Sequence, residues 1–173
     1  MARGDWHMDR TANRGLVDDS TRREMVVLLP RLRRFAFALT GSVDEGDDLV
    51  QATYERALDR LGQWQNGSRL DSWMFRIAHN LHRNRERAAR IRARHHGTAA
   101  SEARMTLGAV QRFVRTLPAE QQTASVLVGV EGLSYKEAVH VLDLPMGTLT
   151  SWLGCARIAF ANGPPPEPAE GGG

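Results

Sequence analysis

The sequence has little of several residue classes, and each shortage excludes something. One cysteine, Cys155, stands in 173 residues, so no disulfide can form within the chain, which is typical of a reducing cytoplasm. No apolar run approaches the ~20 residues that cross a bilayer, and the opening MARGDWHMDR lacks the apolar core of a signal peptide. The alternation of valine, isoleucine and threonine that is typical of strands is almost absent. We therefore expect a soluble, cytoplasmic, all-α protein without membrane insertion.

Patterns of catalysis and cofactor binding are also missing. No glycine loop stands between a strand and a helix, where it could cradle phosphate. His79, His82, His95 and His96 lie near one another, but no thiolate or spaced acid completes a metal site. Cys155 has no paired base, so we expect a small buried packing residue. The sequence predicts that the protein is not an enzyme and needs no cofactor and no metal.

What the chain does have is a strongly basic segment at 73–94. It holds seven arginines and one acid, Glu86, a local charge of +6 in a chain whose total is +3. Apolar residues recur along it at steps of three, four and seven: Trp73, Ile77, Leu81, Ala88 and Ile91. A helix could turn this stripe to a core and the arginines outward. Because arginine suits phosphate, we expect a nucleic-acid contact rather than a merely solvated face.

Periodicity and composition divide the chain into two small helical domains. The ends are rich in glycine, proline and polar residues, and HHGTAASEARM after the basic segment is typical of a linker. The expected division is an arm at 1–20, a first domain at 21–94, a linker at 95–104, a second domain at 105–161 and a tail at 162–173.

The first domain is expected to place two amphipathic helices before the basic one. A helix from Thr21 that ends at Gly41 would bury Met25, Leu28, Leu29, Leu32, Phe35, Ala36 and Leu39. A helix from about Asp47 to Leu61 would bury Leu49 or Val50, Tyr54, Ala57, Leu58 and Leu61. Its exposed face would carry Asp48, Gln51, Glu55 and Asp59. These acids either bind a partner or only cap and solvate the helix.

The second domain has the pattern of a helix-turn-helix. A stripe of Leu107, Val110, Val114 and Leu117 and a helix at 119–130 precede it. Ser134 and Glu137 have the spacing of a capping box. A turn at DLPM then leads into a second helix from about Gly147, whose N-terminus could meet phosphate.

Two segments resemble a known family. DDLVQATYERAL, a short loop with Trp64 and then RLDSWMFRIAHN resemble region two of bacterial sigma factors of the extracytoplasmic-function (ECF) group. LSYKEAVHVLDLPMGTLTSWLGCARIAF resembles region four of the same group. Together the two resemblances cover roughly residues 25–160. They imply a non-enzymatic protein that binds core RNA polymerase, recognises promoters and helps to open the DNA strands.

The resemblance also implies roles for individual residues. The residues expected on the polymerase clamp helices are Asp47, Asp48, Leu49, Gln51 and Glu55. The loop at 63–69 is expected to capture an unstacked base of the minus-ten element. The residues expected on this element are Trp64, Asn66, Ser68, Arg69, Arg76, Asn80, Arg83 and Arg87. The residues expected on the minus-thirty-five element are Lys136, Gly147, Thr148, Thr150, Ser151, Trp152 and Arg157. The polymerase flap and an anti-sigma factor are further implied partners.

The second domain departs from the family pattern. Thr150, Trp152 and Cys155 stand where the family has basic residues, and Asp143 replaces the usual turn glycine. Asp tolerates the left-handed conformation that this turn requires. From 105 to 160 the chain has four basic and four acidic side chains, a net charge of zero. Recognition of the minus-thirty-five element is therefore expected to be weak or altered.

Two other interpretations remain open. A sigma-like decoy would engage an anti-sigma factor or polymerase without starting transcription, and the neutral second domain favours it. An unrelated helix-turn-helix repressor would have no use for the acidic helix.

Overall fold

The computed structural model describes residues 19–64, 69–96 and 116–162, and expectations for the remaining residues lie outside it. All regular structure in these ranges is helical, so the predicted all-α class is confirmed. The elements are α1 (Asp19–Thr40), α2 (Val43–Arg60), the 3-10 turn η2 (Leu61–Gln63), α3 (Leu70–His96), α5 (Ala119–Ser125), the π-helical turn η3 (Val126–Val130), α6 (Tyr135–Leu142) and α7 (Met146–Asn162). None of these helices combines the length and apolar character of a membrane span.

A tight turn joins α1 to α2. Gly41 has a φ of 71°, which a glycine adopts without strain, as expected for the end of α1. The side chain of Ser42 then accepts a hydrogen bond from the backbone N–H of Glu45 and caps α2. Helix α2 therefore begins at Val43, one turn earlier than the expected start near Asp47.

The core between α1 and α2 contains most of the predicted residues. Met25, Leu32, Phe35, Ala36, Leu39, Leu49, Val50 and Ala57 are buried. Two predictions are wrong, because Leu29 is 38% exposed and Leu58 is 50% exposed. Both lie at the edge of the apolar face of their helix. Tyr54 is half-buried, and its hydroxyl donates to the carbonyl oxygen of Met25 at 2.5 Å.

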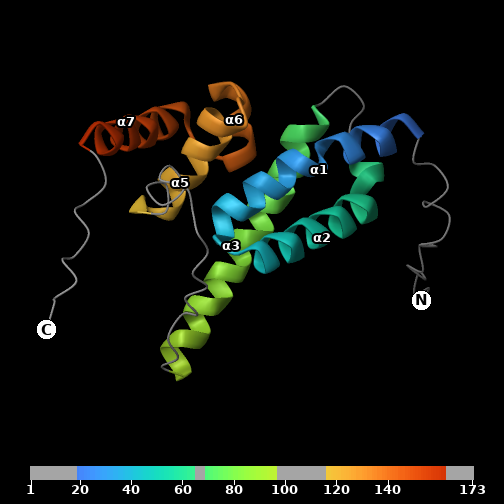
Figure 1. Ribbon diagram of the computed structural model, residues 1–173, viewed down its shortest axis with the longest axis horizontal. Helices are drawn as coiled ribbons and strands as arrows, with labels where there is room; N and C mark the ends of the chain where they lie inside the picture. Colours follow the sequence, from blue (N-terminus) through green and yellow to red (C-terminus); the bar gives the residue numbers. More distant parts are fainter. Residues whose placement is uncertain (1–18, 65–68, 97–115, 163–173) are drawn as a thin grey trace, which may run out of the picture.

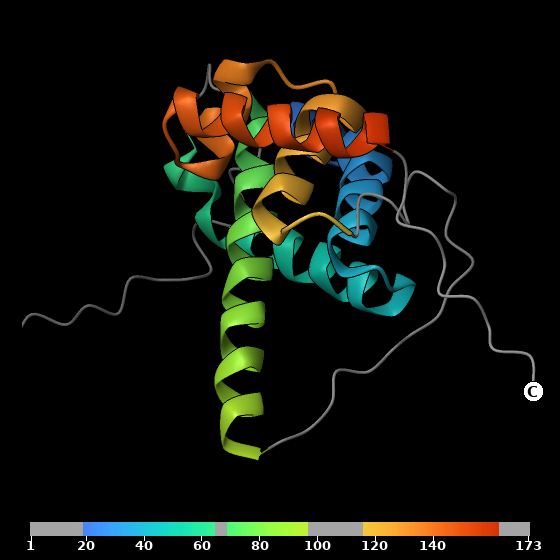
Figure 2. The ribbon, with the colours of Figure 1, turned by 90° about the vertical axis from the view of Figure 1, so that its left-hand side faces the viewer.

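The predicted stripe of α3 packs against the core in its first half only, at the edge of the most buried face. Its buried apolar residues are Leu70, Met74, Phe75 and Ala78, while Trp73, Ile77 and Leu81 are half-buried. Ala88 is exposed and Ile91 is 50% exposed, so the predicted stripe does not continue into a core. The reason is length: the C-terminal half of α3 projects beyond the other helices (Figures 1 and 2).

The helix-turn-helix pattern is confirmed. Helix α6 has the predicted capping box between Ser134 and Glu137. Asp143 ends it in the left-handed region, with a φ of 54°, so this carboxylate residue does fill the glycine position of the turn. Before it, the expected helix 119–130 begins as α5, ends as the π-helical turn η3, and is followed by Gly132 with a φ of 70°.

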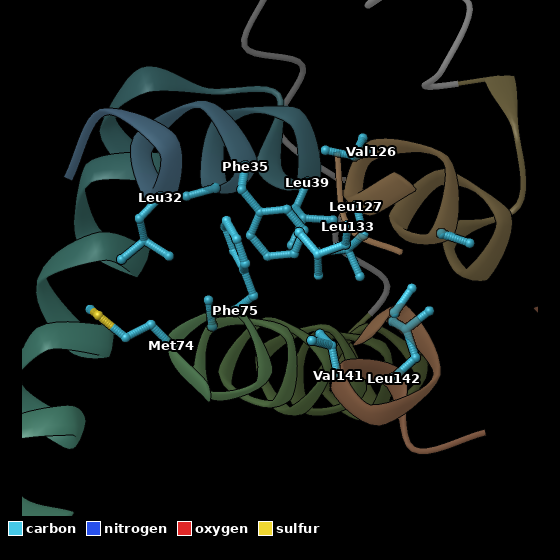
Figure 3. Packing of buried hydrophobic residues seen from close by; sticks show 14 of the residues in the cluster. Leu32, Phe35, Leu39, Met74, Phe75, Val126, Leu127, Leu133, Val141 and Leu142 are labelled. Carbon is cyan, nitrogen blue, oxygen red and sulfur yellow. The ribbon is translucent and has the colours of Figure 1, made fainter. Parts of the chain in front are cut away.

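One hydrophobic core joins the two segments of the chain. Phe35 of α1 and Phe75 of α3 meet edge to face, with ring centroids 5.0 Å apart. Leu127 and Leu133 lie against them, and Val141 of α6 closes the far side (Figure 3). This core crosses the expected boundary between the two domains, and the division itself stays a prediction.

Candidate functional site

An acidic face runs along α2. The predicted residues Asp47, Asp48, Gln51 and Glu55 are exposed there. The side-chain amide of Gln51 donates to Glu55 at 3.0 Å, and Asp47 accepts two bonds of 2.8 Å from Arg33. Asp48 has no side-chain partner among the described residues, so its carboxylate is available. Leu49 is fully buried and holds the helix on its core.

The basic face lies on α3. Arg83, Arg85, Arg87, Arg90 and Arg92 are exposed on its projecting half, while Arg76 is half-buried and Asn80 is exposed. Two arginines have weak internal partners, since Arg85 reaches the carbonyl oxygen of Asp48 at 3.4 Å and Arg90 lies 3.7 Å from Glu86. Exposed guanidinium groups with little internal pairing can contact phosphate. Arg94 lies in α3, but its side chain is outside the description.

A groove of about 600 Å³ adjoins this face. Helix α2 contributes Arg56 and Arg60 to its lining, which sequence reasoning did not single out. Helix α3 contributes ten residues between Ile77 and Arg90, among them Arg83, Arg87 and Arg90, and α5 adds Ala119, Glu120 and Thr123. The groove is therefore basic and is walled by both segments of the chain.

Two histidines of this groove are uncharged near neutral pH. Burial, with help from the charge of Arg83, lowers the pKa of His79 from 6.5 to about 4. Its buried Nδ1 has no hydrogen-bond partner. Burial also lowers the pKa of His82. The described residues contain no group of three potential metal-ligating side chains. These imidazoles therefore add no positive charge to the basic face.

The predicted minus-ten loop is described only at its edges. Asn66 and Ser68 lie outside the described residues. Trp64 is half-buried against the core, and its indole nitrogen is buried without a partner. Arg69 is exposed, yet it pairs with Asp71 at 2.7 Å and with Glu137 of α6. Hence a residue expected on DNA contacts the helix-turn-helix segment here.

Asp71 is the centre of a charged cluster that sequence reasoning missed. Burial alone would raise its pKa, but hydrogen bonds from Arg69, Arg31 and the backbone N–H of Ser72 outweigh burial and lower the pKa. Arg31 donates to Asp71 at 3.0 Å and lies 5.3 Å above the Phe75 ring. Asp71 therefore forms ion pairs with two arginines in the first turn of α3.

Glu131 completes the cluster from the other segment. Its side chain has an exposed fraction of 0% and accepts hydrogen bonds from Arg31 at 3.2 Å and from Arg34 at 2.8 and 3.0 Å. Arg31 also donates to its carbonyl oxygen at 2.9 Å. No local pattern in the sequence could indicate these partners, because they lie 97 and 100 residues away from Glu131.

The helix-turn-helix presents a largely uncharged surface. Lys136, Gly147, Thr150 and Ser151 are exposed, and Thr148 is half-buried. The hydroxyl of Thr150 donates to the carbonyl oxygen of Gly147 at 3.0 Å. Arg157, the basic residue of α7, donates to the Tyr135 hydroxyl at 2.6 Å. Arg157 is therefore the one arginine on the described surface of α7.

Two side chains of α7, Trp152 and Cys155, differ in how far they are buried. Trp152 is half-buried and packs against the core, so part of its ring is unavailable to DNA. Cys155 is exposed, and the prediction that it is buried is wrong. The buried apolar residues of α7 are instead Leu149, Leu153 and Ala156.

The sequence is similar to a family model and to several known proteins. The family model described as the Sigma2 domain of PhyR matches residues 25–79. The ECF RNA polymerase sigma factor EcfG of Rhodopseudomonas palustris is 34% identical over 148 residues, which cover 80% of this chain and 82% of the relative. SigM of Mycobacterium tuberculosis, also named an ECF RNA polymerase sigma factor, is 30% identical over 141 residues, which cover 76% of this chain and 70% of SigM.

A solved structure extends this similarity to three dimensions. The sigma factor RpoE from Bartonella quintana, in complex with the anti-sigma factor NepR, superposes with a TM-score of 0.75 at 26% identity. The match covers 84% of this chain and 96% of that one. The anti-anti-sigma factor PhyR of the same organism has a TM-score of 0.59 at 20% identity, which shows a shared fold alone.

Proposed function

Because the chain belongs to the ECF family of RNA polymerase sigma factors, we propose that it binds core RNA polymerase and directs transcription initiation at promoters. The observation that carries this proposal is the similarity to EcfG across most of both chains. Sigma factors are not enzymes. In this proposal the acidic face of α2 binds polymerase, the basic face of α3 binds the minus-ten element, and the helix-turn-helix binds the minus-thirty-five element.

The acidic face of α2 is proposed to dock on the clamp helices of the polymerase. Asp48, Gln51 and Glu55 are exposed along one side of a capped helix that is anchored by the buried Leu49. Complementary charge at such a surface sets orientation and the rate of encounter. Asp47 belongs to the same face but pairs with Arg33, so its contribution is partly used within the protein.

Charge reversal tests this docking. Asp48→Lys is expected to weaken co-purification with core polymerase, because it places a cation on the acidic face without breaking a side-chain pair. Glu24→Lys makes the same change at an exposed position of α1 and serves as the control. Equal recovery of polymerase with both variants would contradict the assignment.

The basic face of α3, with Arg76, Asn80, Arg83 and Arg87, is proposed to lie along the minus-ten region. Removing one phosphate contact lowers the slope of log K against log salt by about 0.9 for duplex DNA. Arg87→Ala should show this change in promoter binding by the holoenzyme, whereas Arg23→Ala, on exposed α1, should not. An unchanged slope for Arg87→Ala would refute a phosphate role.

The helix-turn-helix is proposed to contact the minus-thirty-five element through the start of α7, with Lys136 and Arg157 as basic flanks. Few charges support that contact, so its affinity should be low. The flap of the polymerase is a further proposed contact of this segment. An anti-sigma factor is also a proposed partner, supported by the RpoE structure, which was solved with NepR.

A regulatory role without initiation is the second candidate function. Two observations favour it: the family model that matches 25–79 is described from PhyR, and the second segment has no net charge. Run-off transcription with purified core polymerase separates the two. A transcript that depends on this chain supports the initiator, and polymerase binding without a transcript supports the regulator.

A further inference from the structure

Four arginines of the basic groove have no counter-charge. Arg56 and Arg60 line it from α2, and Arg83 and Arg87 line it from α3. None of the four forms a hydrogen bond or an ion pair with another described residue. Each pair is spaced i, i+4 on its helix, and like charges at this spacing repel each other. The groove therefore has the electrostatics of a site that an anion would stabilise.

The acids of the groove offset only part of this charge. Glu86 lies 3.7 Å from Arg90, so these two side chains largely neutralise each other. Glu120 of α5 is the other acid of the described lining. With five arginines and two glutamates, the lining has a formal charge of +3. A groove lined by one sign of charge concentrates ions of the opposite sign.

The size of the groove favours a compact ligand. Its volume of about 600 Å³ lies within the range of roughly 300–1,000 Å³ that is typical of small-molecule sites. Three helices line it, and α5 lies beside the middle of α3 (Figure 2). A DNA duplex is far larger than this space, whereas a small anion can enter it and contact arginines of both α2 and α3.

The spacing of the arginines favours several linked phosphates over one. Arg56 and Arg60 are one helical turn apart, as are Arg83 and Arg87, so each pair spans about 6 Å along its helix. A guanidinium binds phosphate through two parallel hydrogen bonds, and a single phosphate group has few oxygens to share among four such forks. A chain of linked phosphates offers acceptors to both pairs.

The rest of the lining is less polar. Ile77 and Leu81 are half-buried against the core, and Ala119 adds a methyl group. Burial lowers the pKa of His79 and of His82, so both imidazoles are uncharged near neutral pH. Apolar side chains and uncharged imidazole rings can pack against a nucleobase. Two sources of linked phosphates therefore fit the groove, a nucleotide and an inorganic polyphosphate.

We propose that this groove binds a compact anion with linked phosphates, and that the bound anion competes with minus-ten DNA for Arg83 and Arg87. The competition rests on the proposed promoter function, which assigns these two arginines to the minus-ten region. Binding of the anion to the free chain does not rest on it. Arg56 and Arg60 belong to the anion site alone, so their substitution separates the two activities.

Calorimetric titration of the free protein with ATP and with tripolyphosphate, in buffer without divalent metal ions, tests the site. Salt of about 0.15 M screens general attraction between distant charges. Both ligands should bind once per chain, and Arg56→Ala and Arg60→Ala should each raise the Kd by about tenfold, because each removes a charge-assisted contact with phosphate. Arg23→Ala, on exposed α1, should match the parent. The ligand that binds more tightly identifies the source, and equal affinities indicate that the phosphate chain alone is recognised.

Two results of the titration would overturn the site. One is no binding to the folded parent, and the other is an affinity that Arg56→Ala and Arg60→Ala leave unchanged. Inorganic phosphate provides a further control, since it should bind at least about tenfold more weakly than tripolyphosphate. Equal affinity for the two would overturn the requirement for linked phosphates.

Promoter binding by the holoenzyme tests the competition. At matched ionic strength, tripolyphosphate should weaken promoter binding several-fold for the parent and much less for a double variant with Arg56→Ala and Arg60→Ala. Without the anion, the double variant should bind the promoter as the parent does. Equal inhibition of both proteins would overturn the competition. If the parent holoenzyme binds no promoter at all, the proposed function fails, while the titration of the free chain still decides whether the groove binds the anion.

Discussion

Protonation of His79 should destabilise the protein in mildly acidic solution. The side chain lies in the groove between α3 and α5, its Nδ1 is buried without a hydrogen-bond partner, and its pKa is lowered to about 4. The unfolded chain has a histidine pKa near 6.5. Between these values the unfolded state binds the proton more readily, so stability falls as the pH falls from about 6.5 to about 4.

The size of this effect follows from the two pKa values. At pH 5 the unfolded imidazole is almost fully protonated and the folded one almost neutral, so the loss relative to pH 7.5 is about 2 kcal/mol. The full loss, reached below the folded pKa, is on the order of 3 kcal/mol. Such a loss is a large part of the stability of an ordinary domain.

Urea unfolding at pH 7.5, 6.5, 5.5 and 5.0 measures this dependence. His79→Gln removes the titrating group, so its free energy of unfolding should decrease less with falling pH than that of the parent, with a difference of about 2 kcal/mol at pH 5. Asn84→Gln, altered at an exposed position of α3 that carries no titrating group, should keep the parent's slope. Parallel curves for the parent and His79→Gln would refute the reasoning. The burial of His82 lowers its pKa as well, so a smaller slope should remain in His79→Gln.

Four further predictions concern the recognition helix, the turn and the buried aspartate. Cys155→Arg, at an exposed position, should strengthen promoter binding at moderate salt without loss of stability, and a gel shift at two salt concentrations checks it. Trp152→Arg should instead cost about 1 to 3 kcal/mol of stability, because the ring packs against the core; thermal unfolding that is unchanged would count against that packing. Asp143→Gly should stabilise the protein by up to about 1 kcal/mol by relieving a left-handed φ, as a shift of the urea midpoint would show. Asp71→Asn should cost about 3 kcal/mol at neutral pH, since two arginines lose their buried acceptor, and its cost should shrink in acid as the parent aspartate is protonated.

Much of the local structure could be predicted from the sequence. The capping box of Ser134 and Glu137, the glycine that ends α1 and the buried positions Leu32 and Phe35 all follow from spacings of three or four residues. Such spacings act within one helix, and their physical effect does not depend on the rest of the fold. The left-handed conformation of Asp143 was also predictable, because the residue stands at the turn position that requires a positive φ.

The errors share one cause. The stripe along α3 is periodic as far as Ile91, yet Ile91 is exposed because no other described helix extends that far. Leu58 has helical spacing but lies at the edge of its face, and Cys155 is small and apolar but faces solvent. Periodicity shows which residues share a face, but it does not show whether another element covers that face.

The sequence by itself determined the helices, their caps and the family of this protein, since these depend on neighbouring residues and on side chains at fixed spacings. The tertiary structure alone decided that Glu131 is buried between Arg31 and Arg34 and that Arg69 is occupied by carboxylates from both segments. These bonds join residues as many as 100 positions apart, and no local pattern encodes such a distance. Whether a charged side chain faces DNA or another charge depends on which surfaces meet when the chain folds.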